Sequence, residues 1–441
     1  MSVSSPTLLP VPQPGPAAAI AWVRRHLGDL CLEGPDGVTS SPGFRGGQSA
    51  ADARLAALDV TGYARRRNEV HPPQRRGATR LSPYVRHGLL DLPTVWRHVA
   101  DAPRADRERY RDELLWQEYA RHLYARLGPV IARPLRHPPP VSPPLAVPGP
   151  TDPPPAAPPP TDPPPAAPAP TDPWPREMAC MDLAVGELER DGWLVNQTRM
   201  WLASQWTVRA GHDWREGEDR FFRHLLDGSR AANRLGWQWT VGTGTGRPYG
   251  FSRWQVRRRA PGLCDTCRLR DCCPVEAWPD EAGGVAPPVD PPPGLRGDPD
   301  PVTTAGPAAV DLDGEAPGCV WLTFESLGDA DPALAAHPGL PVVAVFDEEL
   351  LARLRLSGKR LVFLAETLAD LATRRDLEVH RGDPVEVLAG RRAAVTHAPV
   401  PGFRTRARRI RPAAVHPWPW LVPPHAGPVT SFTAWRRAAG V

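Results

Sequence analysis

Apolar residues recur three and four positions apart through two stretches of the chain, and this spacing predicts amphipathic helices. The first stretch contains DELLWQEYARHLYARL at 112–127. The second, between residues 181 and 228, contains MDLAVGELERDGW, QTRMWLASQWTVRAG and GEDRFFRHLLDG. No run of strict alternation competes with these patterns. We therefore expect an all-α region built from both stretches.

The pattern of apolar and polar residues changes after residue 317. Short apolar runs, GCVWLTFES and PVVAVFD, precede the helical pattern KRLVFLAETLADLATRRD, and LEVHRGD and AAVTHA follow it. Buried strands that alternate with helices indicate βαβ units and a parallel sheet covered on both faces. The C-terminal region is therefore predicted to be an α/β, Rossmann-like domain.

Two spacers divide the chain. The 59 prolines and 38 glycines are too many for compact structure of this length. Residues 134–175 carry the repeat TDPPPAAPPP, TDPPPAAPAP, TDPWP, which favours extended polyproline conformation. We expect disordered, proline-rich linkers between three folded parts, in the order 17–133 (helical), 134–175 (linker), 176–279 (helical, with a cysteine cluster), 280–316 (linker) and 317–435 (α/β).

Positive charge is almost entirely arginine, because Lys359 is the only lysine. Residues 61–140 contain 16 arginines against eight acidic residues. This local excess suits a polyanionic partner, and a solvated basic face is the alternative. The start of the chain lacks the features of a signal peptide, and no later stretch approaches eighteen apolar residues. We expect a cytoplasmic protein without a membrane partner.

Four segments of the helical part resemble, in order, the FAD-binding domain of the photolyase/cryptochrome family. They are RRGATRLSPYVRHGLL, DELLWQEYARHL, DGWLVNQTRMWLASQW and DWREGEDRFFRHLLDGSRAANRLGWQWTVGTGTG. The C-terminal segment beginning CVWLTFESLGDADPALAAHPGLPVVAVFDEELL is similar to the α/β domain that opens photolyases, and PVTSFTAWRRA resembles its end. The resemblance implies the family's two domains in reversed order, which joining linkers and surface termini tolerate.

The resemblance implies FAD as cofactor and assigns its contacts to Tyr63, Thr79, Leu81, Ser82, Gln117, Asn196, Arg199, Asp227, Ser229 and Asn233. On spacing alone, a Thr or Ser beside a helix start is more often an N-cap. Two positions depart from the family pattern. Ala78 stands where a hydroxyl is common, and Ser229 stands where a second carboxylate is usual.

The same resemblance places Trp237 and Trp214 as inner members of an electron-transfer chain, with Trp174 as an outer candidate. It assigns catalytic contacts to Glu113, Trp116, Met200 and Asn233, with Glu113 and Trp116 sharing a helix face toward a flipped pyrimidine dimer. Gln117 and Gln197 stand where many dimer photolyases have arginines. Core packing is the alternative explanation for the tryptophans.

A cluster of cysteines is a second feature of the sequence, and its interpretation does not depend on the family resemblance. Cys264, Cys267, Cys272 and Cys273 lie within ten residues, and thiolates at such spacing hold zinc or an iron–sulfur cluster in some proteins. Adjacent cysteines rarely bind one metal together, so we expect three local ligands and a distant one, for which Cys180 is a candidate. Reduced, packed thiols are the alternative.

The resemblance to the photolyase/cryptochrome family implies a flavoprotein lyase, of the deoxyribodipyrimidine photo-lyase kind, that repairs damaged DNA with blue light. A cryptochrome-like photoreceptor without repair activity is the alternative, favoured by the missing arginines and carboxylate. A DNA-binding relic without flavin is a third hypothesis. The resemblance also allows an antenna chromophore, which no residue identifies, and we expect a monomer.

Overall fold

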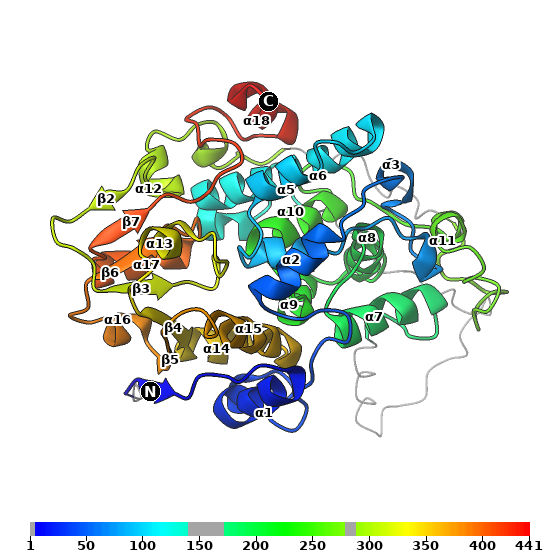
Figure 1. Cartoon of the computed structure of the whole chain (residues 1–441). Helices are drawn as coiled ribbons and strands as arrows, with labels where there is room; N and C mark the ends of the chain where they lie inside the picture. The colour runs from blue at the N-terminus through cyan, green and yellow to red at the C-terminus, as the bar shows by residue number, and fades with distance from the viewer. Residues whose placement is uncertain (1–4, 140–171, 278–287) are drawn as a thin grey trace, which may run out of the picture.

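A seven-stranded sheet forms one side of the molecule in the computed structural model, which describes residues 5–139, 172–277 and 288–441 (Figure 1). The strand order is β1-β5-β4-β3-β6-β7-β2. The five inner strands run parallel, as the alternating pattern predicted. They are β3 (Cys319–Leu322), β4 (Val342–Asp347), β5 (Leu377–Gly382), β6 (Ala393–Thr396) and β7 (Ala414–His416).

The two edge strands run antiparallel to their neighbours and come from segments where no strand was expected. β1 (Thr7–Leu9) pairs with β5, and β2 (Asp311–Leu312) pairs with β7. Segments so short carry too few residues for a periodic pattern to identify them. The segment 280–316 was expected to be a linker. In its described part it holds β2, the short helix α12 (Pro301–Ala305) and the buried side chain of Leu295.

The central strands β3 and β4 are almost wholly apolar because both faces of the sheet are covered there. All four residues of β3 are buried, and so are residues 342–346 of β4. The helices of this α/β part are α13 (Pro332–Ala336), α14 (Glu348–Leu354), α15 (Gly358–Leu371), α16 (Pro384–Val387) and α17 (Pro401–Ile410). α15 is buried along almost its whole length, because other elements pack on both of its sides.

The helix α1 (Pro16–Leu27) belongs with this α/β part, although the helical region was expected to begin at residue 17. Its buried residues follow the helical spacing, at Ala19, Trp22, Val23 and Leu27. α1 packs along α15, and the Trp22 ring lies 5.7 Å from that of Phe346 in β4. The periodicity predicts an apolar face but says nothing about which partner covers it.

The second part is helical and carries the site described below. Its helices are α2 (Gln48–Ala56), α3 (Tyr63–Arg66), α4 (Ser82–Arg86), α5 (Leu92–His98), α6 (Arg104–Leu127), α7 (Ala179–Asp191), α8 (Asn196–Ser204), α9 (Trp214–His224), α10 (Arg230–Val241) and α11 (Arg253–Arg259). Short 3-10 turns lie at Gly28–Leu30, Pro73–Arg75, Gly128–Ala132 and Pro293–Leu295, and a π turn at Gln205–Arg209. Of the expected spacer 134–175, residues 140–171 lie outside the described part.

The C-terminal segment leaves the sheet and packs on α6. Its helix α18 (Phe432–Ala439) places Trp435, which is fully buried, against the helical part. A core cluster joins α6 to this segment through Leu115, Tyr119, Leu123, Leu127, Val422, Val429 and Trp435. The expected α/β range 317–435 therefore ends in residues that cover the helical part.

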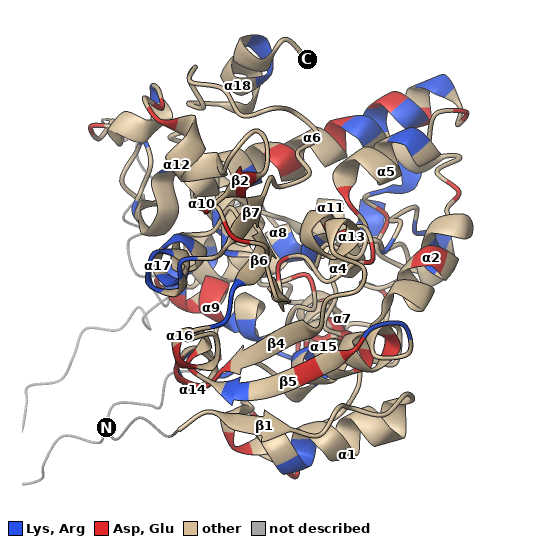
Figure 2. Cartoon of the chain, turned by 60° about the vertical axis from the view of Figure 1, so that its left-hand side comes forward, with Lys and Arg blue, Asp and Glu red and all other residues tan. Residues whose placement is uncertain are grey.

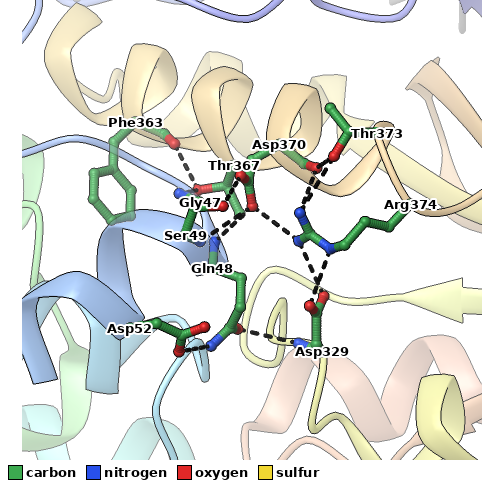
Figure 3. A network of polar contacts seen from close by, with 10 residues as sticks. All are labelled: Gly47, Gln48, Ser49, Asp52, Asp329, Phe363, Thr367, Asp370, Thr373 and Arg374. Atoms are coloured by element: carbon green, nitrogen blue, oxygen red, sulfur yellow. Dashed lines mark hydrogen bonds and ion pairs between the residues drawn. The ribbon is translucent and has the colours of Figure 1, made fainter. Parts of the chain in front are cut away.

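A polar network fastens α2 to the end of α15 (Figure 3). Asp370 accepts hydrogen bonds from the Gln48 backbone N–H (2.9 Å) and from the Ser49 hydroxyl (2.6 Å). These groups begin α2, whose first amides have no partner within the helix. Arg374 joins Asp370 to Asp329 through Nη2 contacts of 2.9 and 3.2 Å. A carboxylate of the α/β part thus caps a helix of the helical part.

Among the helices of the described ranges, none combines the length and the apolar character needed to cross a membrane.

Glu118 is a buried carboxyl group on α6 that holds the C-terminal segment. Its Oε1 accepts the backbone N–H of Leu421 (2.6 Å) and of Val422 (2.9 Å). Burial raises the pKa of Glu118 to about 7, although the two hydrogen bonds oppose the rise. Burial also lowers the pKa of the neighbouring His122 to about 3, which keeps that ring neutral.

We predict a pH-dependent contribution to stability from Glu118. The folded state keeps a proton that the unfolded state loses above its lower pKa, so this contribution to the free energy of unfolding falls as pH rises from about 4.5 to about 7. The slope is at most about 1.4 kcal/mol per pH unit for one group. The buried histidines titrate in the opposite sense, so the measurement is the difference between wild type and Glu118→Gln in chemical denaturation across this range. Equal pH dependence in both proteins would contradict the assignment.

Candidate functional site

A cavity of ≈ 300 Å³ opens between α3, α6, α8 and α10 of the helical part. Its volume lies at the lower end of the range for small-molecule sites. The cavity brings together residues from most of the segments named for the flavin, namely Tyr63, Thr79, Ser82, Glu113, Gln117, Asn196, Arg199, Met200, Asp227, Asn233 and Trp237. Leu81, Trp116, Trp174, Trp214 and Ser229 are outside its lining.

One wall is the turn of residues 77–82. The Trp193 Nε1 donates to the Ser82 hydroxyl at 3.0 Å, and the Thr79 hydroxyl lies 3.5 Å from that of Tyr110. Leu81 is buried and forms the N-cap of α4, so its side chain faces the core. The turn therefore presents the hydroxyls of Thr79 and Ser82 at the cavity.

Arg80 is a residue of this wall that the sequence interpretation missed. Its backbone is left-handed, with φ of 61°. The guanidinium lies over the rings of Phe44 (4.6 Å) and Trp193 (5.2 Å), and burial lowers its pKa. Arg80 Nε is buried and has no hydrogen-bond partner among the described residues. An anion at the cavity would satisfy this donor, which an arginine in a GATRLS turn could have suggested.

The opposite wall carries an ion pair. Arg199 Nη2 and Asp227 Oδ2 lie 2.7 Å apart. Among the described polar atoms that are buried without a hydrogen-bond partner are Oδ1 of Asp227 and Nδ2 of Asn233. One is an acceptor and the other a donor, and both residues line the cavity. Buried polar groups are normally paired, so this wall fits a ligand with complementary donors and acceptors.

Ser229 lies close to this wall in sequence but has another role. Its hydroxyl accepts the backbone N–H of Ala231 at 3.2 Å and caps α10. Serine is a preferred N-cap because its oxygen satisfies a free helix amide. The position expected to contact the flavin therefore acts on the helix that carries Asn233.

At the cavity mouth, α6 presents Glu113 and Gln117, which are one helical turn apart. Glu113 Oε1 lies 3.2 Å from Arg67 Nε and 3.6 Å from Arg109 Nη2. Trp116 lies outside the cavity lining. Its ring stacks on Phe432 of α18 with centroids 4.0 Å apart and an angle of 12°. The two positions are three residues apart on α6, and the C-terminal segment offers Trp116 an apolar partner that periodicity could not reveal.

A row of aromatic rings leads away from the cavity. The Trp237 ring lies 5.1 Å from Phe221, which lies 5.9 Å from Trp174, and Trp174 lies 5.0 Å from Trp206. Trp206 was missed by the sequence interpretation, because nothing distinguishes it there from a core tryptophan. Trp214 is buried at the start of α9, under the Arg215 guanidinium.

Four of the cysteines line a second, smaller cavity of ≈ 20 Å³. They are Cys180 of α7 together with Cys264, Cys267 and Cys273, whereas Cys272 is exposed and outside the lining. Burial raises the pKa of the Cys180 thiol to about 12, and the neighbouring thiols of Cys264 and Cys273 add to the rise. In the described ranges no three His, Cys, Asp or Glu side chains are arranged as a metal centre.

Arginines gather on the first half of α6 and on α17 (Figure 2). Their helical spacing leaves many of them exposed, as with Arg104 in its surface pair with Glu108. Exposed pairs of this kind contribute little stability. These two helices thus present guanidinium groups, which bind phosphate well.

Comparisons with known proteins agree with this geometry. A family model described as the FAD binding domain of DNA photolyase matches residues 178–258, which include Arg199, Asp227 and Asn233. A deoxyribodipyrimidine photo-lyase of Vibrio cholerae is 46% identical over 211 residues, covering 45% of this chain and 42% of the relative. One of Synechococcus sp. is 29% identical over 209 residues, covering 45% of this chain and 39% of the relative. The chain thus spans about two fifths of the length of these relatives.

Two solved structures are also similar. A class III photolyase from Agrobacterium tumefaciens has 21% identity and a TM-score of 0.38, covering 53% of this chain and 45% of its own. A cryptochrome from Synechocystis sp. has 20% identity and a TM-score of 0.40, covering 50% and 44%.

We predict that Gly217 is required where the aromatic row begins. A Cβ there would lie 2.2 Å from Trp237 Cη2 and 3.0 Å from Trp206 Cδ2. Gly217→Ala should therefore lower the free energy of unfolding by about 1–3 kcal/mol, because two buried rings must shift. Gly186→Ala on α7 is the control, since the nearest atom to its Cβ is 3.9 Å away. Helix propensity should make that variant more stable by about 0.5–1 kcal/mol. Equal denaturation curves for Gly217→Ala and Gly186→Ala would contradict the prediction that a Cβ at position 217 is too close to the two rings.

Proposed function

We propose that the chain is a member of the photolyase/cryptochrome family, that it binds FAD in the ≈ 300 Å³ cavity and that it repairs pyrimidine dimers in DNA with blue light. The observation that carries the proposal is the pair of unsatisfied atoms, Asp227 Oδ1 and Asn233 Nδ2, beside the Arg199–Asp227 ion pair. A flavin ring offers both an N–H donor and carbonyl and nitrogen acceptors. The residues present therefore fit the cofactor.

One wall of the cavity binds the pyrophosphate of the cofactor and the other binds its ring. Thr79 and Ser82 offer hydroxyls for the pyrophosphate, and Arg80 offers the unpaired Nε. On the other wall, Asp227 would accept a hydrogen bond from the ring and Asn233 would donate one to it. Arg199 offsets the charge of Asp227 at 2.7 Å, since a buried carboxylate needs a partner. Tyr63, Asn196 and Gln117 complete the lining.

When bound and reduced, FAD supplies the electron that excitation with blue light sends to the dimer and that returns after the cyclobutane ring has split. The chain's own task is to hold the flipped base at the mouth of the cavity. Flipping costs a few kcal/mol and costs least for a damaged, poorly stacked base. Glu113 accepts hydrogen bonds from the base edge, Gln117 extends this polar edge, and Met200 supplies an apolar contact.

Trp116 remains a proposed platform for the base. In the structure its face is covered by Phe432 at a centroid distance of 4.0 Å. A base that stacks there would take the place of Phe432, and base–aromatic stacking is worth about 1–3 kcal/mol. Trp237 and Trp174 remain proposed members of an electron path, in which the aromatic row adds Phe221 and Trp206. Trp214 is proposed as a member from the resemblance alone.

We predict flavin absorption bands in the purified protein and restored bases after blue illumination with an oligonucleotide that contains a dimer. Glu113→Gln should lower the repair yield by about tenfold, because a charged hydrogen-bond acceptor is lost. Glu108→Gln is the matched control on the same helix, because Glu108 is exposed and pairs with Arg104. Flavin bands without repair would overturn the enzyme in favour of a photoreceptor, and a protein without flavin would overturn both.

We further propose that Cys180, Cys264, Cys267 and Cys273 bind iron, as an iron–sulfur cluster, or zinc. The support is that all four line one cavity, and metal binding would require their thiols, which are not arranged as a metal centre in the described structure, to turn toward one point. Protein purified without oxygen should contain stoichiometric metal by elemental analysis, and Cys180→Ala should lose most of it. Cys272→Ala is the control and should retain the metal, since Cys272 is exposed outside the cavity. Metal-free wild type would leave packed thiols as the correct description.

A further inference from the structure

The backbone carbonyl of Gly228 is hydrogen-bonded by two arginines from different parts of the molecule. Arg86 of α4 donates through Nε at 2.9 Å, and Arg360 of α15 donates through Nη2 at 3.2 Å. Residues 225–229, here called the flavin loop, contain both Gly228 and Asp227. The α/β part therefore touches the loop that carries the carboxylate of the cavity.

Arg360 reaches the flavin loop through the helical part's own core. Its Nη1 donates to the carbonyl of Phe222, and its guanidinium lies 4.7 Å from the Phe222 ring centroid. The planar fork of arginine holds two acceptors at once, which a lysine ammonium cannot reproduce. Arg360 thus ties the end of α9 to the flavin loop with a single side chain.

A second arm of the α/β part reaches the same loop. The carboxylate of Glu325, which follows β3, accepts hydrogen bonds from both terminal nitrogens of Arg86, at 2.6 and 2.8 Å. The His87 ring lies between the carbonyls of Phe324 (2.9 Å) and Leu226 (3.1 Å). The flavin loop is therefore held from α15 on one side and from the end of β3 on the other.

The contact is costly, which argues that it has a specific role. Arg360 is 4% exposed, and burial followed by the charge of Arg86 lowers its pKa to about 9. The acceptors it contacts, Phe222 and Gly228, offer carbonyls rather than carboxylates. An apolar side chain of similar size would fill the space without the cost of burying a charge.

We propose that Arg360 is a positioning residue for the flavin site: it fixes the flavin loop, and through it the direction of Asp227. The α/β part then determines how tightly and in which redox state the helical part holds its cofactor. This inference rests on the proposed binding of FAD. Arg360 does not line the cavity and acts through Gly228.

The test compares Arg360→Lys with Arg374→Met. Arg360→Lys keeps a buried charge but cannot hold both carbonyls. We expect it to weaken FAD binding about tenfold or more, since hydrogen bonds to charged groups are worth that much. The midpoint potential of the bound flavin should shift as well, a readout that a purely structural role would not move. Arg374 is an arginine beyond the other end of α15 with an exposed ion pair, so its variant should change affinity by less than about threefold.

Hydrogen exchange in the FAD-free protein provides an independent readout. The amides of Leu226 and Gly228 donate to Gly192 O (2.8 Å) and Leu225 O (2.9 Å), and their exchange should speed up in Arg360→Lys but not in Arg374→Met. Wild-type exchange and affinity in Arg360→Lys would overturn the proposal. A wild type that takes up no FAD would instead overturn the proposed function, while the exchange rates would still decide the role of Arg360.

Discussion

The candidate site depends on a buried carboxylate that must be kept in one direction. Asp227 is 9% exposed and has Arg199 on one oxygen, while its other oxygen has no partner in the described structure. A carboxylate in such surroundings is costly unless a ligand completes its hydrogen bonds. The loop around it is consequently tied by hydrogen bonds from α4 and α15 and cannot relax toward water. Both parts of the molecule thereby contact the loop that carries Asp227.

The two parts are intertwined rather than placed end to end. α1 lies on α15, the C-terminal segment covers α6, and Asp370 caps α2. Each of these contacts joins residues that are hundreds of positions apart in the chain. The reversed order inferred from the sequence is compatible with this arrangement, because the contacts depend on which surfaces meet and not on the order of the segments. The site at the centre is supported from several directions.

The sequence predicted the main classes of structure and much of the cavity, and its failures have physical causes. Periodicity identified α6, α9 and α15 and the buried strands β3 and β4, because each places apolar residues at a fixed spacing. It could not identify β1 and β2, which are too short to have a period. The sequence correctly placed Glu113, Arg199, Asp227 and Asn233 together, because each lies in a distinctive motif and all four line the cavity. Trp116 and Ser229 are outside the lining. Trp116 stacks on Phe432 and Ser229 accepts the Ala231 amide, and a linear sequence pattern shows neither partner.

The two short edge strands have a consequence for the behaviour of the protein in concentrated solution. A parallel sheet of buried, β-branched strands is a good template for the addition of another strand if its edge is open. Here β1, with three residues, and β2, with two, run antiparallel along the outer sides of β5 and β7. A second chain would find only a few free backbone groups on either side. The sheet is therefore protected against edge-to-edge aggregation by two fragments that contribute little to its core.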